Sequence, residues 1–100
     1  MSNFHSLEMD IIRHAEANGL LEQPPGLLAR ELDETLFELR DAIAAVDSVT
    51  ISDAMGRSVI DLIILCAMLD IDLSKCLEQA FEKISAEPEA PSNVVFLKKE

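Results

Sequence analysis

Three glutamates in the segment ELDETLFELRDAI, residues 31–43, have the type and spacing that could bind a metal ion. Glu31, Glu34 and Glu38 are three and four residues apart, and on a helix this spacing places side chains along one side. Two interpretations follow from this pattern. The carboxylates form a metal-binding edge, or they are the solvated face of an amphipathic helix, which is the usual meaning of a run of charges.

A second set of charged residues, Asp53, Arg57 and Asp61, recurs every four residues in the next predicted helix. Opposite charges at this spacing pair on a helix surface, at about 0.3–0.5 kcal/mol per pair, so an intrahelical ladder of ion pairs is one interpretation. Asp61 is unusual because it interrupts the apolar segment VIDLIILCAML. If its carboxylate is buried, it needs a hydrogen-bond partner or a wet cleft.

Four predicted helices carry these residues. We expect the first over about residues 3–18, ended by Gly19, because a left-handed residue is favoured after a helix. The second is expected from Leu27 to Val46, after a loop that contains two prolines. The third is expected to be capped by Thr50 or Ser52 and to reach about Leu69. The fourth is expected over residues 73–84, with Asp72 as its cap.

Apolar residues at alternating spacings of four and three predict a packing seam on the second and third helices. These residues are Leu32, Leu36, Leu39, Ile43 and Val46 in the second helix and Met55, Val59, Leu62, Cys66 and Leu69 in the third. The second half of the third helix is apolar nearly all round, and three short neighbours would cover it poorly. The sequence therefore predicts an all-α, four-helix bundle completed by oligomerisation, as a homodimer or a dimer of dimers.

Charge and domain organisation narrow the range of partners. The chain has 100 residues, with 8 basic and 19 acidic side chains and a net charge of −11. Such a chain repels nucleic acids and anionic membranes, so neither is expected as a partner, whereas a nucleotide or a protein remains open. Residues 1–85 are expected to form the helical domain, and residues 86–100 a Pro/Glu linker with a short tail.

Two further residue types bear on location and chemistry. Cys66 and Cys76 occupy apolar positions of predicted helices and form no CxxC pair, so buried free thiols are expected. The N-terminus lacks a basic region followed by an apolar run, and the longest apolar stretch, residues 62–69, is too short to cross a bilayer. A cytoplasmic location is therefore expected. His5 and His14 have no nucleophile or acid arranged around them and are expected at the surface.

Three stretches together resemble the MazG-like, all-α nucleoside triphosphate pyrophosphohydrolases, in particular the short phage-type and bacterial members. HAEANGLLE resembles the end of the family's first helix, and ELDETLFELRDAI resembles its acidic second helix. LIILCAMLDIDLSKCLEQAFEKI, with the tail NVVFLKKE, is similar to the passage from the third helix to the C-terminus. The resemblance implies Mg²⁺ held by carboxylates on two helices, and cleavage of a nucleoside triphosphate to a monophosphate and pyrophosphate.

The family's metal ligands are largely replaced in this chain. The resemblance places the second-helix pair of ligands at Thr35 and Glu38, and the third-helix pair at Ala54 and Arg57. Only Glu38 carries a carboxylate, and Arg57 is a permanent cation. We therefore expect Arg57 to pair with Glu38 where the family would place Mg²⁺.

Two classes of function remain open from the sequence. In the first, the metal site is degenerate, the protein is inactive or weakly active, and it acts by binding or regulation. In the second, it is an active Mg²⁺-dependent pyrophosphohydrolase that uses a displaced cluster, Glu34, Glu38, Asp53 and Asp61. No residue is assigned a catalytic role in either case. An unrelated acidic helical protein that binds a cellular partner would have the same composition.

Overall fold

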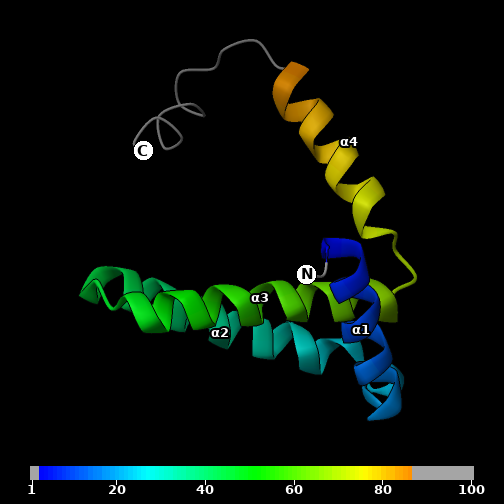
Figure 1. Ribbon diagram of the computed structural model, residues 1–100, viewed down its shortest axis with the longest axis horizontal. Helices are drawn as coiled ribbons and strands as arrows, with labels where there is room; N and C mark the ends of the chain where they lie inside the picture. The colour runs from blue at the N-terminus through cyan, green and yellow to red at the C-terminus, as the bar shows by residue number, and fades with distance from the viewer. Residues whose placement is uncertain (1–2, 87–100) are drawn as a thin grey trace.

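The structure is built on a long helical hairpin. One helix crosses this hairpin, and another projects away from it (Figure 1). The computed structural model describes residues 3–86. In chain order the elements are α1 (Phe4–Ala17), the 3-10 helix η1 (Leu20–Glu22), α2 (Pro25–Ala45), α3 (Ser48–Met68) and α4 (Leu73–Ala86). The predicted all-α class is therefore confirmed for the described residues. The predicted tail, residues 86–100, lies outside them except for Ala86.

Small side chains make up most of the buried residues of α2 and α3, which pack against each other. The buried residues of the two helices are Thr35 and Ala42 on α2 and Ala54, Ser58, Asp61, Ile63 and Ile64 on α3. The hydroxyls of Thr35 and Ser58 donate hydrogen bonds to carbonyls one turn earlier, at 3.0 and 2.8 Å. These polar groups are thus satisfied within their own helices, and the short side chains allow the two helices to approach closely.

The predicted seams are buried only in part. Leu32 and Leu39 on α2 and Cys66 on α3 are half-buried, whereas the remaining seam residues are exposed. Five of the exposed seam residues keep between 44% and 55% of their surface accessible: Leu36 and Ile43 on α2, and Met55, Leu62 and Leu69 on α3. The alternation of four and three marks one apolar stripe on each helix. It does not say which stripe faces the neighbouring helix. The least exposed residues of α2 form an overlapping stripe that mixes small and large side chains: Leu28, Leu32, Thr35, Leu39 and Ala42.

Both helices of the hairpin begin earlier than expected. Pro25 is the first residue of α2, a position where the missing N–H of proline costs nothing and its fixed φ suits the helix. The predicted caps of α3 were wrong, because the helix begins at Ser48 and Asp47 is its N-cap. Val46, with φ of 55°, reverses the chain between α2 and that cap. The β-branched residues after Asp47 lower helix propensity only slightly, so capping sets the boundary.

The first helix crosses the hairpin and packs on α3 (Figure 1). Ala15 is its one buried residue, and the methyl group fits a close crossing of two helices. Gly19 follows with a φ of 72°, which confirms the predicted left-handed residue at the end of this helix. The turn leads through η1 back to the start of α2, so α1, η1 and α2 converge beside the second half of α3.

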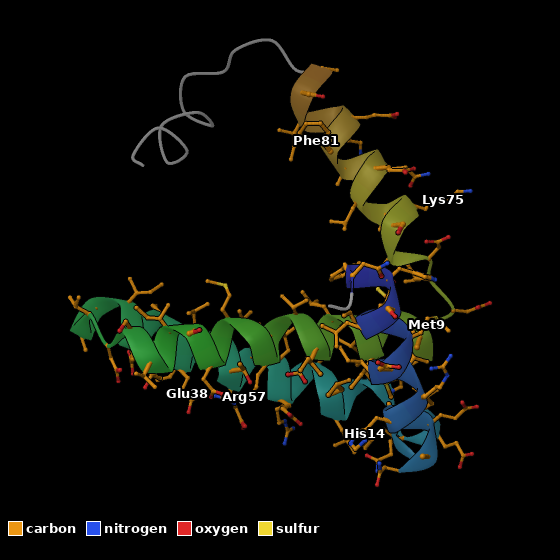
Figure 2. The ribbon with its side chains drawn as sticks, in the orientation of Figure 1. Met9, His14, Glu38, Arg57, Lys75 and Phe81 are labelled. Atoms are coloured by element: carbon orange, nitrogen blue, oxygen red, sulfur yellow. The ribbon has the colours of Figure 1, made fainter. Side chains whose placement is uncertain are left out.

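The fourth helix projects away from the hairpin and buries none of its residues (Figures 1 and 2). Asp72 caps it as predicted, because the backbone N–H of Lys75 donates to the Asp72 carboxylate at 3.2 Å. Its apolar face is exposed to between 58% and 67% at Leu77, Phe81 and Ile84. The helix is therefore amphipathic, and its apolar side is largely uncovered within the described chain, with only Leu73 at its start half-buried.

Two smaller expectations concern side-chain exposure. Cys76 is exposed and Cys66 is half-buried, so the expectation of two buried thiols was wrong for Cys76, which lies on the projecting α4. Burial raises the pKa of the Cys66 thiol. His5 and His14 are exposed, as predicted. Within residues 3–86, no helix is both long enough and apolar enough to span a membrane.

Replacing the cap of α3 should destabilise the hairpin. Asp47 accepts hydrogen bonds from the Thr50 backbone N–H at 3.2 Å and from the Thr50 hydroxyl at 2.7 Å, and these bonds lower the pKa of its carboxyl. Asp47→Ala should lower the melting temperature by several degrees at neutral pH, whereas Asp47→Ser, which keeps a cap, should lower it less. Asp41→Ala, an exposed change within α2, is the control. Equal melting temperatures for Asp47→Ala and the control would contradict the assignment of the cap.

Candidate functional site

Arg57 bridges the two helices of the hairpin. Its Nη2 atom donates to Glu38 Oε1 on α2, and its Nε atom donates to Asp53 Oδ2 on its own helix at 3.0 Å. Figure 2 shows Glu38 and Arg57 on the same side of the hairpin, where α2 runs beside the first half of α3. The hydrogen bonds to Glu38 and Asp53 raise the pKa of the guanidinium, which is a permanent cation. The predicted pairing of Arg57 with Glu38 is confirmed.

The other residues considered as metal ligands are distributed around this bridge. Glu31, Glu34 and Glu38 are all exposed on α2 and border a shallow depression beside Arg57. Thr35 and Ala54, at the replaced ligand positions, are buried between the helices. Residues 3–86 contain no group of three or more His, Cys, Asp or Glu side chains that could hold a metal ion.

Asp61 has a different environment from the other carboxylates. It keeps only 5% of its surface exposed, and its Oδ2 atom is buried without a hydrogen-bond partner in the described chain. Burial raises the pKa of this carboxyl, the charge of Glu31 raises it further, and Arg57 acts in the opposite direction. The predicted ladder of ion pairs thus forms only between Asp53 and Arg57, because Arg57 turns to Glu38 instead of extending toward Asp61.

A pocket of about 310 Å³, here called the Asp61 pocket, lies where α1, η1 and the start of α2 meet α3. Its lining is mainly apolar, with His14, Gln23, Glu31, Arg57 and Asp61 as the polar members. In Figure 2, His14 lies toward the end of α1 that is farthest from α4. The sequence signal for this site was the carboxylate inside an apolar segment. Its neighbours could not be predicted, because they come from four separate parts of the chain.

Comparison of the chain with protein-family models, with curated proteins and with solved structures gave no match. The family resemblance therefore rests on the sequence motifs quoted above and stays a prediction. Function has to be inferred from three features of the structure: the Arg57 bridge, the Asp61 pocket and the exposed apolar faces of α3 and α4.

Replacing Asp61 should change how stability depends on pH. The pKa of Asp61 lies above its ordinary value of 3.8 in the folded chain, so the folded state binds this proton more tightly than the unfolded state. Stability therefore rises as pH falls through the folded-state pKa, and this gain is lost again as pH rises through it. Asp61→Asn removes the buried charge and should raise the free energy of unfolding by about 1 kcal/mol at neutral pH.

The advantage of Asp61→Asn should shrink as pH falls toward 3.8, the ordinary pKa of an aspartate, because the raised pKa lets the folded natural side chain take up its proton above that pH. Urea unfolding at a series of pH values measures both effects. Asp41→Asn removes the same charge from an exposed position and should show no such trend. A variant at Asp61 that is less stable than the natural protein at neutral pH would show that the carboxylate has a favourable partner.

Proposed function

We propose that the protein is a non-catalytic relative of the MazG-like pyrophosphohydrolases that self-associates and acts by binding a partner. The observation that carries the proposal is the Arg57 bridge to Glu38 and Asp53. A guanidinium supplies fixed positive charge and several directed donors. Arg57 thereby neutralises these carboxylates at the place where, by the sequence resemblance, the family would hold Mg²⁺.

Catalysis by the family's route would need carboxylate oxygens that are free to coordinate metal. Glu38 and Asp53 already accept hydrogen bonds from Arg57, and the buried side chains of Thr35 and Ala54 provide no carboxylate. A metal ion would have to displace the guanidinium and then bind with too few protein ligands, since activation of water needs a metal in a fixed coordination sphere. These features favour a binding role over hydrolysis.

Metal titration tests this proposal directly. Mn²⁺, followed by electron paramagnetic resonance, should not bind the natural protein, and nucleoside triphosphates with Mg²⁺ should release no pyrophosphate. Arg57→Asp should create Mn²⁺ binding in the millimolar range, because it removes the cation and adds a third carboxylate beside Glu38 and Asp53. Arg40→Asp is the matched control, since it makes the same charge change at an arginine that stacks on Phe37.

Two outcomes would overturn the proposal. Metal binding and pyrophosphate release by the natural protein would show an active Mg²⁺-dependent enzyme that uses Glu34, Glu38, Asp53 and Asp61. Failure of folded Arg57→Asp to bind Mn²⁺ would show that Arg57 does not stand in for a metal. Because repulsion between carboxylates could unfold this variant, its circular dichroism is measured first. If it is unfolded, Mn²⁺ should restore its helicity, and failure to do so would also count against the proposal.

Self-association follows from the apolar surface that the single chain leaves exposed. Several large apolar side chains are at least 39% exposed, among them Met55, Val59 and Leu62 on α3 and Phe81 on α4. The 14-residue α4 buries nothing, and isolated helices of this length are marginal in water, so most helices depend on packing of an apolar face. A second copy of the chain offers matching apolar faces, which supports a homodimer or a dimer of dimers.

Sedimentation at micromolar concentration should therefore detect a dimer or larger assembly. Phe81→Glu places a charge on the apolar face of α4 and should shift the protein toward monomer. Gln79→Glu adds the same charge on the opposite side of α4 and should leave the assembly unchanged. A well-folded monomer of the natural protein, or equal effects of the two substitutions, would contradict self-association through α4.

A further inference from the structure

We propose that the Asp61 pocket binds a small organic cation, with an ammonium or amidinium head group and a compact apolar body. The pocket combines a nearly buried, unpartnered carboxylate with an otherwise largely apolar wall. Asp61 is not one of the ligand positions that the family resemblance assigns, and Arg57, although it lines the pocket, donates its hydrogen bonds to carboxylates outside it. The inference is independent of the proposed function, because it requires neither metal, nor nucleotide, nor a second copy of the chain.

The unpartnered carboxylate is the first observation behind this inference. Asp61 lines the pocket and is 95% buried, and its Oδ2 atom has no donor from the described residues. Leaving a buried acceptor unpaired costs free energy, more so for a charged group. A ligand N–H that reached this carboxylate would supply the missing hydrogen bond. Rotation about the last side-chain torsion of Asp61 exchanges the two oxygens, so either can accept it.

The charges around the pocket select a cation. Glu31 is the second carboxylate on its wall, and Arg57 is the one permanently charged basic residue there. The guanidinium of Arg57 already donates to Glu38 and Asp53, neither of which lines this pocket. An anionic ligand would thus face two acidic side chains with little compensating charge. A bare metal ion is also disfavoured, because the described residues bring no third ligand to Asp61 and Glu31.

The apolar wall and the volume define the rest of the ligand. The aliphatic surface comes from α2 and α3, through Leu27, Leu28, Ile60, Ile64 and Met68. A volume of about 310 Å³ is at the small end of ligand pockets, which run from about 300 to 1,000 Å³. Such a pocket accommodates a ring or a short chain beside the charged head group, and burial of that apolar body adds to the affinity. The chemical class is therefore a small amphipathic amine or amidine.

Benzamidine and benzamide form a suitable pair of probes. They have nearly the same shape, but only benzamidine is a cation at neutral pH. Each is titrated into the isotopically labelled full chain in the presence of a chelator, and amide chemical shifts are followed by nuclear magnetic resonance. Benzamidine should give saturable shifts centred on Leu28, Ile60 and Ile64, and benzamide should bind at least about tenfold more weakly, the size of one charged hydrogen bond.

Substitutions then assign the contact to Asp61. Asp61→Asn should weaken benzamidine binding at least about tenfold, and Glu31→Gln, an exposed change, should weaken it several-fold. Asp41→Asn removes the same charge outside the pocket and should leave binding unchanged. The inference is overturned if benzamidine gives no saturable shift, if the shifts lie away from the pocket, if benzamide binds equally well, or if both acidic variants bind as the natural protein does. Because the titration contains neither metal nor nucleotide, none of these results tests whether Arg57 stands in for a metal ion.

Discussion

Close contact between α2 and α3 through small side chains is the constraint on which the other features of this structure depend. Ala42, Ala54 and Ser58 keep little of their surface exposed, and side chains of this size allow two helix backbones to lie near each other. That proximity brings the long side chain of Arg57 within reach of Glu38 on the other helix. It also encloses Asp61 beside the same contact, so one packing arrangement sets both the ion bridge and the buried carboxylate.

The same contact explains why so much aliphatic surface remains exposed. Apart from Ile63 and Ile64, the buried residues of the hairpin are small or polar. Larger ones such as Leu36, Ile43 and Leu62 stay exposed, and the single crossing helix covers only part of α3. The projecting α4 adds a second exposed apolar face. A chain of this size has little capacity to bury both faces by itself, since small domains bury a smaller fraction of their surface than large ones. Exposed apolar faces of this kind are typical of proteins that assemble with another chain.

Two neighbouring charged residues of α3 show how environment decides chemical role. Arg57 and Asp61 are one helical turn apart, yet Arg57 is solvated and shared between two carboxylates, whereas Asp61 is buried and unpaired. Pairing with carboxylates raises the pKa of Arg57 and so maintains a charge that it carries in any case. Burial raises the pKa of Asp61 and so opposes its charge. Arg57 is therefore suited to neutralise the surface carboxylates around it. Asp61 is suited to bind a ligand that donates a hydrogen bond to its carboxylate.

The sequence by itself determined the helical class, the left-handed Gly19 and the cap at Asp72. These features depend on local propensity, on capping and on the few residues that tolerate a left-handed backbone. The pairing of Arg57 with Glu38 was expected only from the family resemblance, because the charge spacing alone allowed Arg57 to pair within its own helix. Only the tertiary structure decided which stripe of α2 and α3 is buried, because overlapping stripes of apolar and small residues run along both helices and either could have faced the partner helix. It also decided that Asp61 opens onto a pocket. The walls of that pocket come from α1, η1, α2 and α3, and no local pattern records how segments so far apart in the chain converge.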